Sequence, residues 1–88
     1  MSKTILTVDD SPSVRRMVAM TLQEAGYSVI EAVDGQDGLQ KALTHMVDAI
    51  ITDQNMPNLD GLGFIRAFRQ HPQGKGVPII VLSTDSDD

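Results

Sequence analysis

The sequence predicts an α/β fold in which helices cover both faces of an open parallel sheet. Short, mostly apolar segments at residues 5–8, 27–32, 49–52 and 77–83 alternate with three segments whose apolar residues recur at helical spacing, giving the order βαβαβαβ. Such runs are typical of buried parallel strands, and strands that alternate with helices are joined by right-handed crossovers. Since the 88 residues contain no internal repeat and no linker-like segment, we expect a single domain over residues 1–88.

The first helix is delimited by its capping residues. Ser11 can cap the N-terminus, and Pro12 has the fixed φ angle that the first helical position favours. Gly26 would end the helix, because glycine readily adopts the left-handed conformation that a C-terminal cap needs. The apolar face expected between these caps consists of Val14, Met17, Val18, Thr21, Leu22 and Ala25.

The remaining elements follow from turn residues and apolar spacing. Residues 34–37 form a turn that leads into a second helix, and residues 56–61 form a loop that leads into a third. Pro78 must lie near the start of the last strand, because proline cannot donate to a β-ladder. The expected apolar face of the second helix is Leu39, Ala42, Leu43 and Met46. The spacing of Leu62, Ile65, Phe68 and Arg69 suggests the third helix.

Composition and charge exclude several classes of function. A net charge of −5 argues against a nucleic-acid-binding surface. The absence of cysteine excludes disulfides and thiolate metal sites. No apolar run approaches the ~20 residues needed to span a bilayer, and two acids stop the short apolar run near the N-terminus. We therefore expect a cytoplasmic protein that binds neither nucleic acid nor membrane.

Polar residues that can bind ligands follow three of the four predicted strands. Asp9 and Asp10 follow the first, Asp53 ends the third, and Ser83 and Thr84 end the fourth. In open parallel sheets, ligands bind at the carboxyl ends of the strands. Taken singly, each residue has a simpler interpretation as a helix cap, a turn residue or a strand end. Their joint occurrence at strand ends favours a site.

Three neighbouring carboxylates repel one another unless a cation neutralises them. Mg²⁺ is usually held by one or two carboxylates together with waters and phosphate oxygens. Such a site can also receive a phosphoryl group, with one carboxylate as the nucleophile. The sequence therefore predicts Mg²⁺ as the cofactor.

Two other phosphate or metal sites are disfavoured. The turn after the first strand has no glycine fingerprint and places two acids where a nucleotide phosphate would lie. A calcium-binding loop that starts at Asp53 would place Pro57, Asn58 and Phe64 at positions that require an oxygen ligand, a glycine and a glutamate.

Three segments carry a more specific signal: Val-Asp-Asp-Ser at 8–11, Asp-Gln-Asn-Met-Pro-Asn-Leu-Asp-Gly at 53–61, and Pro-Ile-Ile-Val-Leu-Ser-Thr at 78–84. With these segments the chain resembles the receiver domains of response regulators, and most of all the single-domain chemotaxis regulators. The resemblance extends over all 88 residues. It implies a flavodoxin-like doubly wound fold, a role in two-component signal transduction, and a sensor histidine kinase, such as a chemotaxis kinase, as the partner.

The resemblance also implies a role for each acid. Asp53 would be the phosphoacceptor that attacks a phosphohistidine of the kinase. Mg²⁺ would be bound directly by Asp10, Asp53 and the backbone carbonyl of Asn55. Asp9 would contribute mainly through a metal-bound water.

The switching machinery of the family lies at or beyond the end of this chain. Ser83 aligns with the switch hydroxyl that bonds a phosphoryl oxygen, and Thr84 is the less favoured alternative. The chain ends at Asp88, before the family's last helix, strand and helix, and so before the lysine at the end of the fifth strand. We interpret it as a C-terminally truncated receiver domain.

Two functions follow from this interpretation. The first is a phosphoacceptor domain that assists its own phosphotransfer and is not a dedicated enzyme. The second is a non-switching receiver fragment that acts as a binding or oligomerisation module. The strand at 77–83 would be an unpaired edge, and a missing last helix would expose the sheet around the first and third strands. We expect a homodimer or higher oligomer that covers these surfaces.

Overall fold

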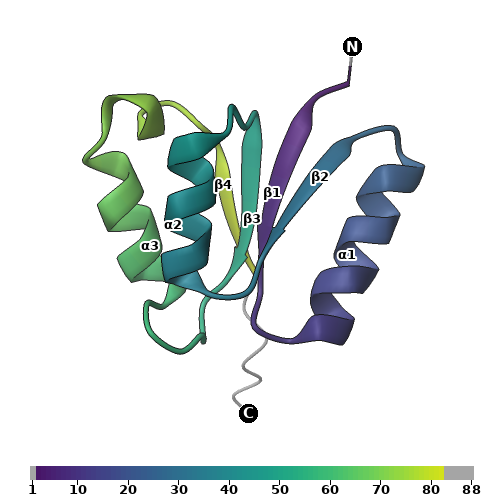
Figure 1. Cartoon of the computed structure of the whole chain (residues 1–88), viewed down its shortest axis with the longest axis horizontal. Helices are drawn as coiled ribbons and strands as arrows, with labels where there is room; N and C mark the ends of the chain where they lie inside the picture. Colours follow the sequence, from purple (N-terminus) through teal and green to yellow (C-terminus); the bar gives the residue numbers. More distant parts are fainter. Residues whose placement is uncertain (1, 83–88) are drawn as a thin grey trace.

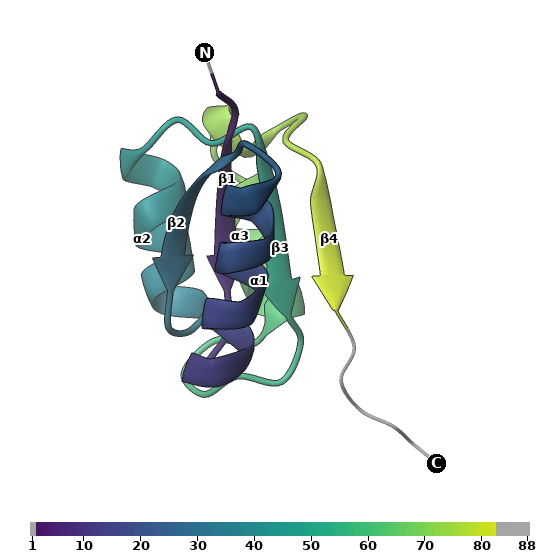
Figure 2. The ribbon, with the colours of Figure 1, turned by 90° about the vertical axis from the view of Figure 1, so that its right-hand side faces the viewer.

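The computed structural model describes residues 2–82 and confirms the predicted α/β fold class (Figure 1). The strands are β1 (Thr4–Val8), β2 (Ser28–Ala32), β3 (Ala49–Asp53) and β4 (Ile79–Leu82), and the helices are α1 (Pro12–Glu24), α2 (Gly35–Thr44), α3 (Gly61–Arg69) and the short 3₁₀ helix η1 (Pro72–Gly74). Within the described residues, all four strands run parallel in one sheet with the order β2-β1-β3-β4. Helix α1 covers one face, and α2 and α3 cover the other (Figures 1 and 2). Over residues 2–82, no helix combines the length and apolar character needed to cross a lipid bilayer.

The strand register brings the carboxyl ends of the strands to one edge of the sheet. Val8 at the end of β1 pairs with Ala32 of β2 and Thr52 of β3. Asp53 at the end of β3 pairs with Leu82 of β4. Residues that follow β1 and β3 therefore lie at the same edge, as the parallel arrangement requires.

The capping predictions for α1 are confirmed. The Ser11 hydroxyl accepts a hydrogen bond from the Val14 amide at 3.4 Å. Gly26 has φ +98°, the left-handed conformation that ends a helix, and its amide donates to the Gln23 carbonyl at 3.0 Å. The last strand begins at Ile79, directly after Pro78, whose carbonyl still accepts from the β3 strand.

The main core lies between the sheet and helices α2 and α3. Leu6 and Val8 of β1 face this side, and Phe64 and Phe68 of α3 stack with ring centroids 6.1 Å apart. Burying a phenylalanine fully stabilises the fold by about 1.5–3 kcal/mol. A side chain at Gly38 would meet both Val8 methyl groups at 3.0 Å, so glycine lets α2 approach the sheet. The complete cluster is Leu6, Val8, Ala32, Ala42, Ile50, Phe64 and Phe68.

The predicted apolar faces of the helices are partly wrong. In α3 the buried side chains are Phe64 and Phe68; the sequence pattern included Phe68 but not Phe64, and Leu62, which it did include, is 51% exposed. Met46 is 94% exposed, because α2 ends at Thr44 and cannot carry it onto the core. In α1 the predicted face is too wide: its Met17, Thr21 and Ala25 are exposed, and the only fully buried residue is Ala19. The spacing of apolar residues is compatible with more than one buried face of a helix, and packing against the sheet determines which face is buried.

The exposed part of the sheet agrees with the expectation for the last strand and differs from it around β1. Ile5 and Thr7 of β1 are buried on the face that α1 covers, so the sheet around β1 is not open. As expected, β4 is an exposed edge strand, with Ile80 58% exposed and Val81 also exposed. Figure 2 shows β4 at the rim of the sheet, beside β3 and away from α1.

One contact ties α2 to the loop that follows β3. Asp34 caps α2 by accepting a hydrogen bond from the Asp37 amide at 2.8 Å, and its second oxygen accepts from the Asn58 side chain at 2.6 Å. Asn58 has φ +71°, a conformation that asparagine tolerates better than most residues. The Asp37 amide and then the Asn58 amide group hold the pKa of Asp34 below its ordinary value.

We predict that Asp34→Ala lowers the free energy of unfolding by about 1 kcal/mol at neutral pH, because α2 loses its N-cap. Because the folded-state pKa of Asp34 is lowered, its ionised contribution is complete above the unfolded-state pKa and is lost as pH falls through the folded-state pKa. Urea unfolding at several pH values measures the difference. Gln36→Ala, at an exposed position in the same turn, is the control. A deficit that stays constant into acid would show that the Asp34 charge contributes nothing.

Candidate functional site

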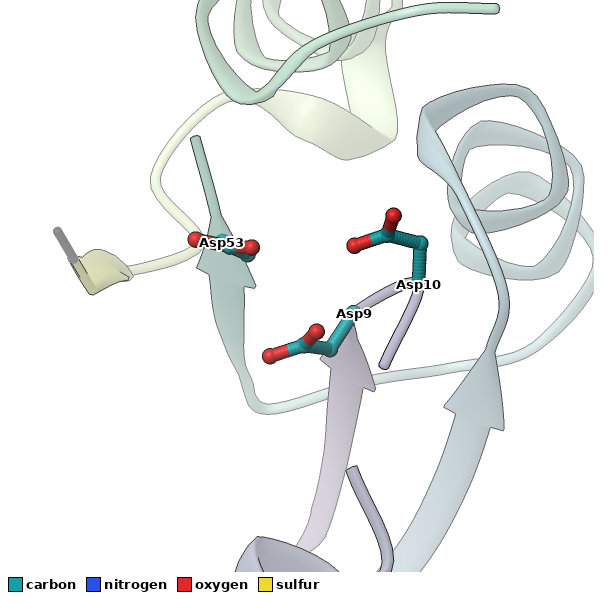
Figure 3. Close-up of side chains that lie close together, drawn as sticks. All are labelled: Asp9, Asp10 and Asp53. Carbon is teal, nitrogen blue, oxygen red and sulfur yellow. The ribbon is translucent and has the colours of Figure 1, made fainter. Parts of the chain in front are cut away.

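Three carboxylates meet at the carboxyl edge of the sheet. Asp9 and Asp10 lie in the loop between β1 and α1, and Asp53 is the last residue of β3 (Figure 3). One oxygen from each lies within 4.8 Å of the others. Asp9 is only 4% exposed and Asp53 only 5%, whereas Asp10 is exposed to solvent. Figure 3 shows the side chains of Asp10 and Asp53 approaching from opposite sides of a shared space.

The loop that carries Asp9 is held by three hydrogen bonds. The Asp9 amide donates to the Ala32 carbonyl at 3.1 Å, and this hydrogen bond extends the pairing between β1 and β2 by one residue. Its carboxylate accepts from the Ser11 amide at 2.9 Å. Its carbonyl accepts from the Arg15 guanidinium at 2.8 Å. Asp9 is therefore fixed at its amide, its side chain and its carbonyl.

The end of β3 is joined to the start of α3. The Asp53 carboxylate accepts from the Gln54 amide at 2.8 Å. The Gln54 side chain then bonds both the Asp60 carboxylate, at 3.2 Å, and the Leu62 amide, at 3.0 Å. A side chain at Gly61 would lie 2.5 Å from the Asp53 carbonyl, so only glycine permits this close approach. Helix α3 thus begins directly against Asp53.

The electrostatics of the cluster follow from its burial. Burial raises the pKa of Asp9, and the nearby charges of Asp53 and Asp10 raise it further. The Ser11 hydrogen bond and the Arg15 charge act in the opposite direction. Ionising Asp9 therefore costs more free energy in the folded protein than in the unfolded chain, as long as no cation neutralises the cluster.

The donor set fits a hard divalent cation. Carboxylate oxygens are the ligands that Mg²⁺ prefers, and the exposed side of Asp10 leaves room for the waters that Mg²⁺ retains. The structure brings together the three acids that the sequence singled out. Asn55 lies in the exposed loop two residues beyond Asp53. The predicted switch hydroxyls, Ser83 and Thr84, fall outside the described residues; the preceding Leu82 is the register partner of Asp53.

Sequence reasoning missed the residues that hold these loops in place. Arg15 bonds the Asp9 carbonyl, Gln54 joins β3 to α3, and Asn58 joins the same loop to α2. Polar residues at loop and helix positions give no sequence signal for such contacts, because the partners are far apart in the chain or lie on the backbone.

Comparison with known proteins agrees with this geometry. The family model of the response regulator receiver domain matches residues 5–88. The response regulator ArlR of Staphylococcus aureus is 40% identical over 83 residues, which make up 94% of this chain and 36% of ArlR. The chain therefore spans about a third of the length of this curated relative.

Solved structures extend the likeness. The Vibrio cholerae chemotaxis protein CheY4 is 45% identical with a TM-score of 0.93, and the match covers 99% of this chain and 72% of CheY4. The receiver domain of the sensor histidine kinase PA1611 from Pseudomonas aeruginosa is 33% identical with a TM-score of 0.92, covering 97% of this chain and 70% of that domain. That domain was crystallised with a magnesium ion coordinated in its active-site cleft. From the family match, the identities and the acid cluster, we conclude that this chain belongs to the response regulator receiver domain family.

Proposed function

We propose that Asp53 is the phosphoacceptor of this receiver domain. A carboxylate oxygen of Asp53 attacks the phosphorus of a phosphohistidine, the N–P bond breaks, and its electron pair stays on the imidazole nitrogen of the donor. The observation that carries the proposal is the convergence of three carboxylates within 4.8 Å at the carboxyl edge of a parallel sheet. An isolated carboxylate is a weak nucleophile toward an anionic phosphoryl group unless that charge is offset.

We assign Asp10, Asp53 and the Asn55 carbonyl as direct ligands of Mg²⁺, and Asp9 as a ligand through water. When bound, the ion offsets negative charge on the phosphoryl oxygens and on the acids. The Ser11 hydrogen bond to the Asp9 carboxylate leaves further acceptor sites on that group, because an ionised carboxylate has about four. The magnesium ion in the active-site cleft of the related PA1611 domain supports Mg²⁺ as the ion that this site binds.

The partner that fits this chemistry is a sensor histidine kinase carrying a phosphohistidine. Likeness to CheY4 makes chemotaxis one pathway to test. In this proposal the domain assists its own phosphotransfer in the cytoplasm and is not a dedicated enzyme. Ser83 would bond a phosphoryl oxygen and act as the switch hydroxyl, with Thr84 as the alternative.

A second candidate function is assembly, and the exposed β4 strand favours it. Among the described residues, β4 pairs with a strand on one side only, with Ile80 58% exposed. Edge strands with apolar side chains are templates for pairing with another chain. We propose that a second copy covers β4, giving a homodimer or larger oligomer.

Asp53→Asn is expected to abolish phosphorylation by acetyl phosphate and Mg²⁺, because the amide is not a nucleophile. Intact mass spectrometry would show the mass of one added phosphoryl group on the unaltered chain and no added mass on the variant. Asp48→Asn is the matched control: Asp48 is exposed and accepts from the Thr4 amide at 2.8 Å, near the start of β1 and away from the site. A phosphoryl group gained by the Asp53 variant would place the acceptor elsewhere. No gain by the unaltered chain would favour the assembly function.

Asp9→Asn is expected to raise the free energy of unfolding at neutral pH in metal-free buffer. Because burial raises the folded-state pKa, ionised Asp9 destabilises the fold above that pKa, and this penalty vanishes as pH falls below the unfolded-state pKa. The amide can still accept from Ser11. Urea unfolding from pH 3 to 8 with EDTA tests this, and the gain should shrink toward acid. A variant less stable at neutral pH would refute the repulsion argument.

Ile80→Lys is expected to weaken self-association by about tenfold or more, because an unpaired charge would be buried in the pairing surface. Sedimentation at tens of micromolar would measure the oligomeric state. Leu62→Lys, at a similarly exposed apolar position on α3, is the control. A monomer at all concentrations, before any substitution, would eliminate the assembly function.

A further inference from the structure

Arg15 links the acid site to the neighbouring strand β2. It lies on α1, and its side chain is only 16% exposed. Its Nη1 donates to the Asp9 carbonyl oxygen at 2.8 Å, and its Nε donates to the Glu31 carboxylate of β2 at 3.1 Å. The neighbouring Arg16 also bonds Glu31, at 2.9 Å, and is mainly exposed. The planar guanidinium thus spans a backbone carbonyl of the site and an anchoring carboxylate.

The carbonyl that Arg15 holds belongs to the peptide group between Asp9 and Asp10. Because a peptide group is planar, fixing the direction of its carbonyl also fixes the direction in which Asp10 leaves the loop. Within residues 2–82, the exposed Asp10 side chain makes no hydrogen bond of its own. Its placement therefore depends on the backbone that carries it.

We propose that Arg15 is a positioning residue of the acid site. It holds the Asp9–Asp10 peptide in the orientation from which both carboxylates face Asp53, and Glu31 holds Arg15. This inference rests on the proposed function, because it assumes that the three acids bind Mg²⁺. Partners that orient metal ligands typically change metal affinity roughly 10–100-fold when removed.

The charge of Arg15 and its positioning role have opposite effects on Mg²⁺ affinity. A positive charge near the site repels a cation, so removing the charge alone would tighten Mg²⁺ binding. Loss of the hydrogen bond to the Asp9 carbonyl would loosen the Asp9–Asp10 peptide and weaken Mg²⁺ binding. The sign of the change therefore separates the two roles.

The test is an NMR titration of each ¹⁵N-labelled variant with MgCl₂, which reports affinity and folding together. Arg15→Met is expected to weaken Mg²⁺ binding roughly 10-fold or more. Arg16→Met removes an equal charge and a bond to the same Glu31 but touches no site residue, and it should bind within about twofold of the unaltered chain. Arg15→Lys keeps the charge without the planar fork, so its affinity should also fall, by several-fold.

Each outcome distinguishes this inference from the proposed function. Mg²⁺ binding by the unaltered chain, with equal or tighter binding by Arg15→Met, would overturn the positioning role alone. No binding by the unaltered chain would overturn the proposed metal site, and the positioning role with it. If Arg15→Met does not fold, Arg15→Lys provides the test. Mg²⁺ affinity equal to that of the unaltered chain would show that only the positive charge at this position is needed, and would overturn the positioning role.

Discussion

The parallel register of β1 and β3 is the constraint on which the rest of the molecule depends. Val8 and Thr52 are register partners, so the residues that follow them, Asp9 and Asp53, emerge side by side at one edge of the sheet. Covalent geometry and strand pairing place these two acids together before any side-chain interaction is considered. Asp53 therefore lies on a strand and Asp9 directly follows one, and strands hold the groups of a site more accurately than loops do.

Three side-chain contacts fix the loops around this edge, and each joins a site loop to a neighbouring element. Arg15 joins the Asp9 carbonyl to Glu31 of β2, Gln54 joins β3 to α3, and Asp34 joins α2 to Asn58. Hydrogen bonds of this kind between separate elements stabilise one arrangement of the backbone over its alternatives. The contacts give the acids a defined geometry even though Asp10 itself is exposed.

The same geometry opposes stability. Burial and neighbouring charges raise the pKa of Asp9, so ionised Asp9 destabilises the folded protein when no cation is bound. Sites that bind charged ligands commonly sacrifice stability in this way, and binding of the ligand recovers it. In this protein, the apolar core between the sheet and helices α2 and α3, where Phe64 and Phe68 are buried, offsets the destabilisation by the acids.

By itself, the sequence determined the order of the elements, the helix caps at Ser11 and Gly26, and the meeting of Asp9, Asp10 and Asp53 at one edge, because each follows from local pattern and strand direction. Only the tertiary structure decided which apolar side of each helix is buried. In α3 Phe64 is buried and Leu62 is exposed, and Met46 lies outside α2. The tertiary structure also decided that Arg15 bonds the Asp9 carbonyl. Helical spacing permits several faces and a polar side chain can reach many partners, so these choices depend on how distant segments pack together.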